Sequence, residues 1–248
     1  MSELDVSKIL FRCSSLGQLM TEPKSKQDKI EANLSETAKS YLIDVYVNYK
    51  SGRKNEFTNK YVEKGLMVEE DSITLYSRVK KKFFLKNSDM LSNDYIKGTP
   101  DIFDGSEIIT QAKTIIDIKS SWDIFSFFRT FTKPINKDYW WQLQGYMALT
   151  GATNSILAYC LVNTPDLLVN DEKRRLMYKM GAISEENEDF EKACKEIDFN
   201  TKYDDIPLKQ RVNEFYIERD DDAIEKIYEN VIKAREFISI LDENMCDN

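Results

Sequence analysis

The segment Ile115-Ile116-Asp117-Ile118-Lys119 restricts how this chain can fold more than any other stretch. Its β-branched residues favour a strand, and alternate side chains of a strand share a face, so Asp117 and Lys119 project together. A strand inside an α/β protein is normally covered on both faces. Burying a carboxylate and an ammonium group there costs several kcal/mol unless a cation or another partner compensates. The segment therefore predicts a polar site within a sheet.

A second carboxylate, Asp101, follows the turn signal Gly98-Thr99-Pro100. We expect residues 98–119 to form a hairpin that brings Asp101 and Asp117 into one site. Carboxylate oxygens are ligands that Mg²⁺ and Mn²⁺ prefer, and a neighbouring lysine can act on a phosphate oxygen or an attacking water. The pattern predicts a divalent-metal site with Lys119 beside it.

Composition excludes several other classes of protein. Hydrophobic residues make up 42% of the 248 residues and charged residues 31%, which is typical of a soluble globular chain. No apolar run approaches the ~20 residues of a membrane span, and the N-terminus lacks the basic and apolar regions of a secretory signal. We therefore expect a cytoplasmic protein with no membrane partner.

Histidine and cysteine usage narrows the chemistry further. The chain has no histidine, which excludes Ser-His triads and histidine-ligated metal sites. The four cysteines are spaced too widely for the ligand pairs of zinc or iron–sulfur sites: Cys13, Cys160, Cys194 and Cys246. We expect free thiols in a reducing compartment, with no zinc and no iron–sulfur cluster.

Four motifs resemble those of one enzyme family. Pro100-Asp101 followed by Asp117-x-Lys119 resembles the PD-(D/E)xK nuclease signature. Upstream, Gly65 and Glu69 resemble the Gly-x-x-x-Glu helix of phage-lambda-type recombination exonucleases. Downstream, the segment from Gln142 to Tyr146 resembles the Gln-x-x-x-Tyr helix of those enzymes and of RecB-type nuclease domains. The motifs occur in the family order.

The resemblance implies an α/β fold: a restriction-endonuclease-like core with a mixed β-sheet flanked by helices. We place this core, with N-terminal helices, in residues 1–165. Residues 166–248 are expected to form an acidic extension of helices and a strand, packed on the same domain. Residues 183–248 carry 20 acidic and 9 basic residues, whereas residues 1–182 carry 23 and 26. Because the net charge is −8, we expect DNA contact through local patches.

The resemblance also implies a ligand set for one or two Mg²⁺ or Mn²⁺ ions. Asp101 and Asp117 would hold the metal, Glu69 would be a further ligand, directly or through water, and the backbone carbonyl of Ile118 would complete the set. Glu69 shares a face with the apolar stripe of a helix expected over residues 56–78, while Glu70 lies about 100° away. The alternative is that residues 69–71 form a solvated acidic face.

Lys119 and Gln142 are the other expected catalytic residues. Lys119 would orient or deprotonate the attacking water and offset the charge that develops on the phosphorane. By resemblance, Gln142 would lie near the metal and help to hold the phosphate or the water. The alternative for Gln142 is a satisfied surface amide.

Residues of several segments are expected to contact DNA. Basic residues beside aromatics in residues 78–86 suit a nucleic-acid backbone, although cations are also common at helix C-termini. Arg12 with its neighbouring serines can hold a phosphate at a helix start, or one serine can be an ordinary N-cap. The aromatic stretch 122–129, which we expect to be a loop, can stack on a strand or act as a packing lid. The full expected set is Arg12, Ser14, Ser15, Lys80, Lys81, Lys82, Ser120, Lys133, Gln144 and Tyr146.

The remaining periodicities predict further elements. Helices are expected over residues 25–50, ending at Ser51-Gly52, and over 138–150, closed by Gly151. Residues 155–163 and 211–218 are expected to be strands. Three more helices are expected over residues 166–180, 184–198 and 220–242.

The resemblance implies a metal-dependent DNA exonuclease that resects duplex ends for recombination or repair, of phage origin or type. Its location would be the cytosol of a bacterium or of a phage-infected host. Relatives include ring-shaped oligomers that act with a single-strand annealing protein.

Three alternatives stay open from the sequence. The chain can be a structure-specific or restriction-type endonuclease, or a nucleic-acid-binding protein without catalysis. The third alternative is that Asp101, Asp117 and Lys119 form only a structural salt-bridge cluster.

Overall fold

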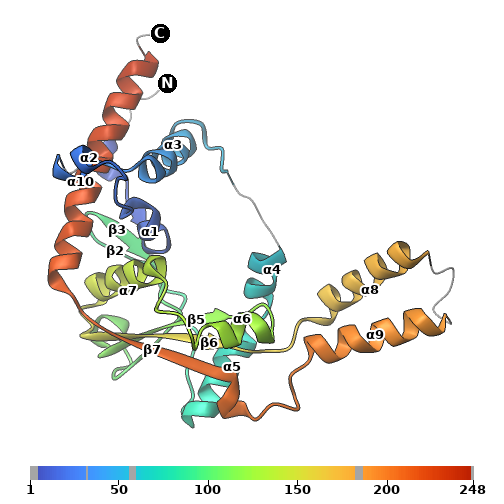
Figure 1. Ribbon diagram of the computed structural model, residues 1–248. Coiled ribbons are helices and arrows are strands. Elements are labelled where there is room, and N and C mark those ends of the chain that lie inside the picture. Colours follow the sequence, from blue (N-terminus) through green and yellow to red (C-terminus); the bar gives the residue numbers. More distant parts are fainter. Residues whose placement is uncertain (1–4, 32, 56–59, 182–186, 247–248) are drawn as a thin grey trace.

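The computed structural model describes residues 5–31, 33–55, 60–181 and 187–246 (Figure 1). A four-stranded sheet with strand order β4-β5-β6-β7 forms its centre. The strands are β4 (Ile102–Asp104), β5 (Thr114–Ser120), β6 (Asn154–Cys160) and β7 (Val212–Glu218). β5 and β6 are parallel, and the two outer pairs are antiparallel, so the sheet is mixed, as the family resemblance implied.

Two helices cover the two faces of this sheet. On one face, Ile116 and Ile118 of β5 belong to the buried cluster that includes Ile73 and Tyr76 of α5 (Glu69–Lys80). On the other face, Ile115 belongs to the cluster around α7 (Lys137–Thr150). Alternation along β5 therefore turns Asp117 toward α7. The crossover from β5 to β6 passes through α6 (Ile124–Arg129) and α7, as a parallel pair requires.

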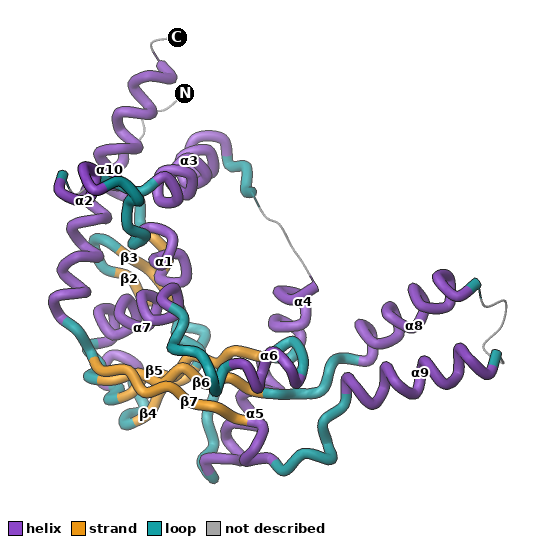
Figure 2. Tube along the Cα trace, viewed as in Figure 1, coloured by secondary structure: helices purple, strands orange, loops and turns teal. Residues whose placement is uncertain are grey.

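A smaller sheet and the N-terminal segments pack against the other side of α7. The strands β1 (Phe11–Arg12), β3 (Ile96–Gly98) and β2 (Leu91–Ser92) lie in the order β1-β3-β2. Around them lie α1 (Leu16–Leu19), α2 (Lys26–Ile30), α3 (Glu36–Ser51) and α10 (Asp221–Cys246). Short 3-10 helices occupy Val6–Lys8, Cys13–Ser15, Ile109–Gln111 and Leu208–Arg211. Figure 2 shows α10 running along this part of the molecule.

The C-terminal region divides in two. The helices α8 (Asp166–Met180) and α9 (Glu188–Thr201) form an arm that projects from the body (Figure 1). In contrast, β7 is a strand of the central sheet, and α10 buries Ile227, Val231 and Ile238 in the main cluster. Residues after 165 therefore contribute to the core as well as to the arm.

Several predicted elements differ from the observed ones. The helix expected over residues 56–78 is two helices, α4 (Lys60–Met67) and α5, which are separated at Val68; residues 56–59 lie outside the described residues. The helix expected over 25–50 is likewise split into α2 and α3. The aromatic stretch forms α6, because Asp123 and Ser126 make a capping box at its start. Ser15 precedes α1, but its side chain makes no capping hydrogen bond there.

Among the residues that the structure describes, no helix combines the length and the apolar character that a membrane crossing requires.

Candidate active site

The hairpin of β4 and β5 sets the two aspartates opposite each other. Ile102 pairs with Ile116, so Asp101 at the start of the hairpin lies across from Asp117. The Ile118 N–H donates a hydrogen bond of 2.7 Å to Asp101 Oδ2, which fixes the orientation of that carboxylate.

Asn87 holds the chain at Asp101, and the sequence analysis missed it. Its backbone N–H donates to the Asp101 carbonyl at 2.7 Å, and its Nδ2 donates to the Pro100 carbonyl at 2.9 Å. A buried asparagine that bridges two carbonyls satisfies backbone acceptors which would otherwise stay unpaired. The only sequence signal was an Asn-Ser pair typical of a turn.

Asp117 is the most enclosed acid of the site, with 1% of its surface exposed. Its Oδ1 accepts a hydrogen bond of 3.0 Å from Gln142 Nε2. Its Oδ2 lies 2.7 Å from Lys119 Nζ as an ion pair and accepts no hydrogen bond from a described residue. Lys119 Nζ also lies 4.8 Å from the ring centre of Tyr139, so a cation–π contact joins the ammonium group to α7.

Gln142 contacts Asp117 but does not line the cavity of about 700 Å³ that opens over Asp101 and Lys119. Its Nε2 donates a second hydrogen bond, of 2.9 Å, to the Tyr146 hydroxyl one helical turn away. Both side chains are buried between α7 and the sheets. Gln142 therefore positions the Asp117 carboxylate, and Tyr146 positions Gln142.

Glu69 is the first residue of α5 and reaches the site from the other face of the sheet. Its Oε2 forms an ion pair of 2.9 Å with Lys86 Nζ. Within the described ranges, no three Asp, Glu, Cys or His side chains are grouped as a metal would need them. The expected three-carboxylate cluster is thus only partly assembled: Glu69 lines the same cavity as Asp101 but is held by Lys86.

The charges of the site are strongly coupled. Burial, together with the nearby Asp117 carboxylate, raises the pKa of Asp101 to about 7, although Lys119 opposes the shift. Burial alone would lower the pKa of Lys119, but the carboxylates of Asp117 and Asp101 outweigh it and raise that pKa. Lys119 is therefore an ammonium group in this arrangement.

A cavity of about 700 Å³ opens over these residues. Its walls come from α4, α5, β5, β6, α6 and α7, from the loop between β5 and α6, and from Asp101 just before β4. The lining residues include Glu69, Asp101, Ile118, Lys119, Ser120, Trp122, Arg129, Tyr139 and Tyr159. Glu69, Asp101 and Lys119, from three separate segments, thus face one space. That space is large enough for a nucleotide-sized ligand.

The donor set fits a divalent cation. Asp117 Oδ2 is a buried carboxylate oxygen that accepts no hydrogen bond from a described residue, and Asp101, whose pKa is raised, lies opposite. Hard oxygen donors of this kind suit Mg²⁺ or Mn²⁺, which would offset the negative charge that Lys119 only partly balances. Glu69 can join such a site once it gives up its ion pair with Lys86.

Comparison with known proteins decides the family. No protein-family model and no curated protein matches the chain. Among solved structures, a phage-related exonuclease from Haemophilus somnus 129PT shares 30% sequence identity, with a TM-score of 0.73 over 96% of this chain and 97% of that one. The chain belongs to the family of phage-related exonucleases. The family resemblance and the fold class predicted from the sequence are both confirmed.

An alkaline exonuclease (LHK-Exo) from Laribacter hongkongensis is more distant. It shares 15% identity and has a TM-score of 0.61 over 96% of this chain and 94% of that one. The same enzyme has been solved in complex with dAMP, with the same similarity values. At this identity, the likeness shows the fold alone.

The basic run of this exonuclease is largely engaged by acids. Lys80 Nζ lies 3.0 Å from Glu214, and Lys82 is paired with Asp104. Lys81 adopts a left-handed conformation, with φ of 53°, where α5 ends. These cations thus lie at and just after the C-terminus of α5, as the helix-end alternative expected. Contact of the segment with DNA stays a prediction.

Two residues expected at the DNA lie in the interior. Gln144 has 0% exposure; its Nε2 donates to the Glu218 carbonyl at 2.9 Å, and its Oε1 accepts from the Asp220 N–H at 2.9 Å. The expectation for Gln144 is wrong, because a fully buried amide whose groups join β7 to α10 has no surface for a phosphate. Tyr146 is also buried, and its hydroxyl serves Gln142.

The other expected DNA contacts lie nearer the surface. Ser120 lines the catalytic cavity, and its Oγ is 2.8 Å from Ser72 Oγ. Arg12 and Ser14 line a neighbouring cavity of about 210 Å³, next to Thr99. Arg12 pairs in register with Lys97 of β3, so two cations stand side by side. Like charges on paired strands repel each other, and a bound anion would relieve that repulsion.

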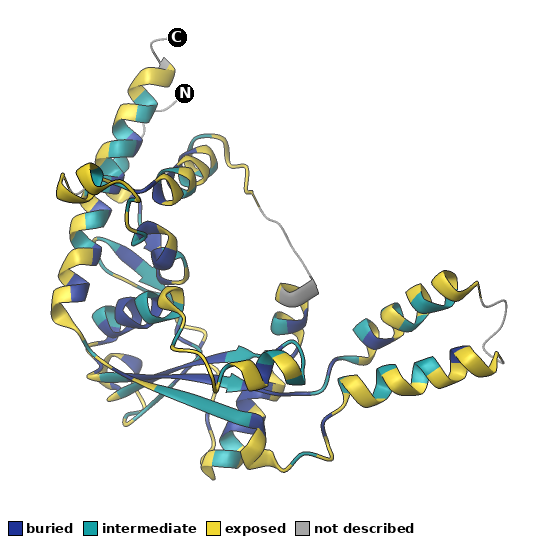
Figure 3. Ribbon diagram, in the orientation of Figure 1, coloured by how far each residue is buried: buried dark blue, intermediate teal, exposed yellow. Residues whose placement is uncertain are grey.

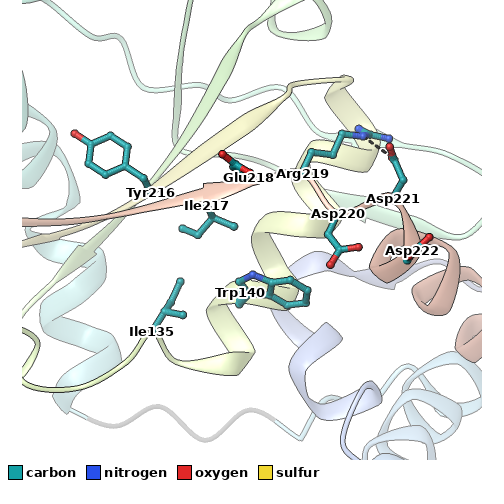
Figure 4. Close-up of a pocket in the computed structure, with 9 residues that line it drawn as sticks. All are labelled: Ile135, Trp140, Tyr216, Ile217, Glu218, Arg219, Asp220, Asp221 and Asp222. Carbon is teal, nitrogen blue, oxygen red and sulfur yellow. Dashed lines mark hydrogen bonds and ion pairs between the residues drawn. The ribbon is translucent and has the colours of Figure 1, made fainter.

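A further cavity, of about 640 Å³, lies away from this chemistry (Figure 4). It lies where β7 leads into α10; Trp140 and Ile135 form one wall, and Asp220 to Asp222 lie at one end. Figure 4 shows the side chain of Arg219 reaching toward Asp221. Arg219 Nε donates a hydrogen bond of 2.7 Å to Asp221 Oδ1. The acidic rim is unsuited to a phosphate backbone.

Proposed function

We propose that this exonuclease hydrolyses phosphodiester bonds at DNA ends and depends on Mg²⁺ or Mn²⁺. The observation that carries the proposal is the pair of carboxylates, Asp101 and Asp117, set opposite each other with the Lys119 ammonium group ion-paired to Asp117. Asp101 and Lys119 line one cavity, and Asp117 is buried behind them. Asp101, Asp117 and Glu69, with the Ile118 carbonyl, would hold the metal. When bound, such a metal supplies Lewis-acid activation of a phosphate oxygen and of a water molecule.

The chain's own residues would then orient and stabilise the reacting groups. Lys119 is placed to offset the negative charge that develops on the phosphorus during attack. Since its pKa is raised by two carboxylates, we assign it this role in preference to that of a base in the metal-free state. Gln142 keeps one Asp117 oxygen hydrogen-bonded, so that Oδ2 alone turns toward Lys119.

Arg12, with Ser14 and Lys97, is proposed as a phosphate-binding patch next to the catalytic hairpin. The like charges of Arg12 and Lys97 on paired strands support this assignment. Family membership further supports a role in recombination or repair. We propose a single-strand annealing protein as the partner and a ring-type homo-oligomer as the assembly. We place the protein in the cytosol of a bacterium or of a phage-infected host.

The proposal is tested with linear duplex DNA labelled at each end in turn, incubated with Mg²⁺, with Mn²⁺ or with EDTA. We expect one of the two end labels to be released first, with Mg²⁺ or Mn²⁺ present, and no label to be released in EDTA. A covalently closed circle of the same sequence should persist. Cleavage of the closed circle would favour the endonuclease alternative.

Lys119→Ala should lower the rate by at least ~10²-fold, as expected for loss of a transition-state charge partner. Lys195→Ala is the matched control, because Lys195 lies on the α9 arm and pairs only with Glu191 among the described residues. Equal rates in Lys119→Ala and the parent would defeat the catalytic assignment and favour a binding protein. No rise in Tm on adding Mg²⁺ would favour the structural salt-bridge cluster.

A further inference from the structure

The catalytic cavity continues into a second cavity beneath α6. This second cavity has a volume of about 320 Å³ and is lined by residues that include Lys133, Asn136 and Phe215. Four residues line both cavities: Ser126, Arg129, Thr130 and Tyr159. The two spaces therefore form one groove, with Asp101 and Lys119 at one end and Lys133 at the other.

The groove has fixed walls. The rings of Tyr159 and Phe215 pack edge to face, with centres 6.0 Å apart. Asn213 Nδ2 donates to Thr130 Oγ1 at 2.9 Å, which ties the end of α6 to β7. Asp123, the acid that precedes α6, is engaged as the cap of that helix through the Ser126 N–H. These contacts hold α6 and the β6–β7 wall of the groove together.

The charge of this segment differs from that of the whole chain. Residues 124–137 contain three cations and no acid, in a protein with a net charge of −8. Arg129 and Lys133 are exposed, and neither forms an ion pair with any residue that the structure describes. Unlike Lys80 and Lys82, these cations are available to an anionic ligand.

Aromatic surface accompanies the cations. Phe125 is 66% exposed and lies four residues before Arg129, so both project from the same side of α6. Aromatic rings beside a cationic groove are a typical arrangement for a nucleic-acid strand, because bases stack on the rings while phosphates meet the cations. A cavity of about 320 Å³ has the size of a small-ligand site, such as one nucleotide would need, and is too small for a double helix.

We infer that this groove, through Arg129 and Lys133, binds phosphates of the DNA strand under digestion, beyond the bond that is cut. The inference rests on the proposed function, since it continues the path of the strand from the catalytic cavity. Arg129 lies where the two cavities meet and would contact the phosphate nearer the metal site. Lys133 would contact one farther along.

The test measures DNA binding without cleavage. A fluorescent single strand of about 20 nucleotides is titrated in EDTA at several salt concentrations between 50 and 200 mM, the range over which counterion release is pronounced. Arg129→Gln and Lys133→Gln should each weaken binding about tenfold at low salt. Each should also reduce the slope of log K against log[salt] by about one, and the double variant by about two.

Two controls separate charge from folding. Arg175→Gln removes an exposed arginine of the α8 arm and should leave affinity and slope unchanged. Arg129→Lys keeps the charge and should restore most of the slope. An Arg129→Gln slope equal to that of Arg175→Gln would overturn the inference and leave the α6 face as a surface for a protein partner.

The outcome is independent of catalysis. A parent protein that binds the strand with the expected slopes but releases no label with Mg²⁺ would overturn the proposed function alone. A parent that cleaves DNA while Arg129→Gln keeps its full slope would overturn this inference alone. A parent that does not bind the strand at all would overturn the inference directly.

Discussion

The two aspartates that face each other across the hairpin destabilise the metal-free protein. Two carboxylates this close resist simultaneous ionisation, and Asp101 has its pKa raised to about 7 by burial and by Asp117. Among the described residues, Lys119 forms its ion pair with Asp117, and its charge offsets the Asp101 carboxylate only in part. The same arrangement that would bind a divalent cation tightly is therefore strained electrostatically without one.

Asp101→Asn should stabilise the metal-free protein at pH 8 by about 1–2 kcal/mol. The asparagine oxygen can still accept the Ile118 N–H hydrogen bond, so that only the charge is lost. Thermal melting in EDTA should show the gain, and the rise in Tm on adding Mg²⁺ should disappear. Asp104→Asn, at the other end of β4, should instead lose a little stability, because hydrogen bonding to Lys82 lowers the pKa of Asp104. A lower Tm for Asp101→Asn in EDTA would contradict the electrostatic account.

Lys64 is a second charged residue in an unfavourable place. It is 1% exposed, and its Nζ donates to the Trp122 carbonyl at 2.6 Å. Burial lowers the pKa of Lys64 to about 8, although Asp123 opposes the shift. Since the unfolded chain keeps its proton up to the ordinary pKa of 10.5, the contribution of Lys64 to stability rises with pH between about 8 and 10.5.

Lys64→Met should therefore raise the unfolding free energy most at or below pH 8, where the buried ammonium group of the parent is charged. Relative to the parent, the unfolding free energy of the variant should fall by up to about 3 kcal/mol between pH 8 and pH 10.5. Urea titrations of both proteins at pH 7, 8, 9 and 10 measure this difference. A difference that does not change with pH would show that Lys64 keeps its proton throughout.

At the scale of elements, the sequence anticipated structure where local signals are strong. The bounds of α8 agree with prediction, and α3 and α7 end at glycines with φ of 71° and 79°, as expected for left-handed helix caps. Short-range patterns, namely a turn signal, a β-branched run and the Gln142–Tyr146 spacing, also predicted the β4–β5 hairpin and the α7 motif. These elements carry Asp101, Asp117, Lys119 and Gln142.

The misses come from contacts between distant segments. The break at Val68 had a signal, since Glu69, Glu70 and Asp71 are the acids typical of a helix start. The ion pair of Glu69 with Lys86 had none, because it joins α5 to the loop before β2 through the tertiary fold. The Asn-Ser pair predicted a turn at Asn87, but not that this loop would bind the Pro100 and Asp101 carbonyls. The inward orientation of Gln144 likewise depends on the β7–α10 junction.

Close contact between α1 and α7 gives a test at this scale. A Cβ on Gly17 would lie 2.6 Å from the Asp138 Cα, a backbone atom that cannot move alone. Gly17→Ala should therefore cost about 2–3 kcal/mol, measured by denaturant unfolding. Gly65→Ala is the matched control: nothing lies within 4 Å of its Cβ, and alanine in a helix should add about 0.5–1 kcal/mol. Equal stabilities for the two variants would mean that α1 does not pack as described.

At the scale of the whole molecule, the core and the arm have different roles. The α8–α9 arm is mostly exposed, whereas the sheets and α7 hold the buried residues (Figure 3). Among the described residues, none of the three buried clusters includes a residue of α8 or α9. The arm is closed at its base, where the Thr164 N–H donates to the Thr201 carbonyl at 2.9 Å and the Tyr203 N–H donates to Asn163 Oδ1 at 2.7 Å.

Replacing residues 167–199 by a short Gly-Ser linker should therefore leave the body folded. We expect a change of about 1 kcal/mol or less, which corresponds to a Tm shift of about 2–4 °C for a chain of this size. Circular dichroism should lose helical signal in proportion to α8 and α9, and metal-dependent cleavage of a short duplex should persist. Truncation after Asn230, which removes the buried Val231, Ala234 and Ile238 of α10, should in contrast abolish cooperative unfolding. If the armless protein loses its cooperative transition as well, the arm is part of the core, because an exposed arm without buried contacts could not remove that much stability.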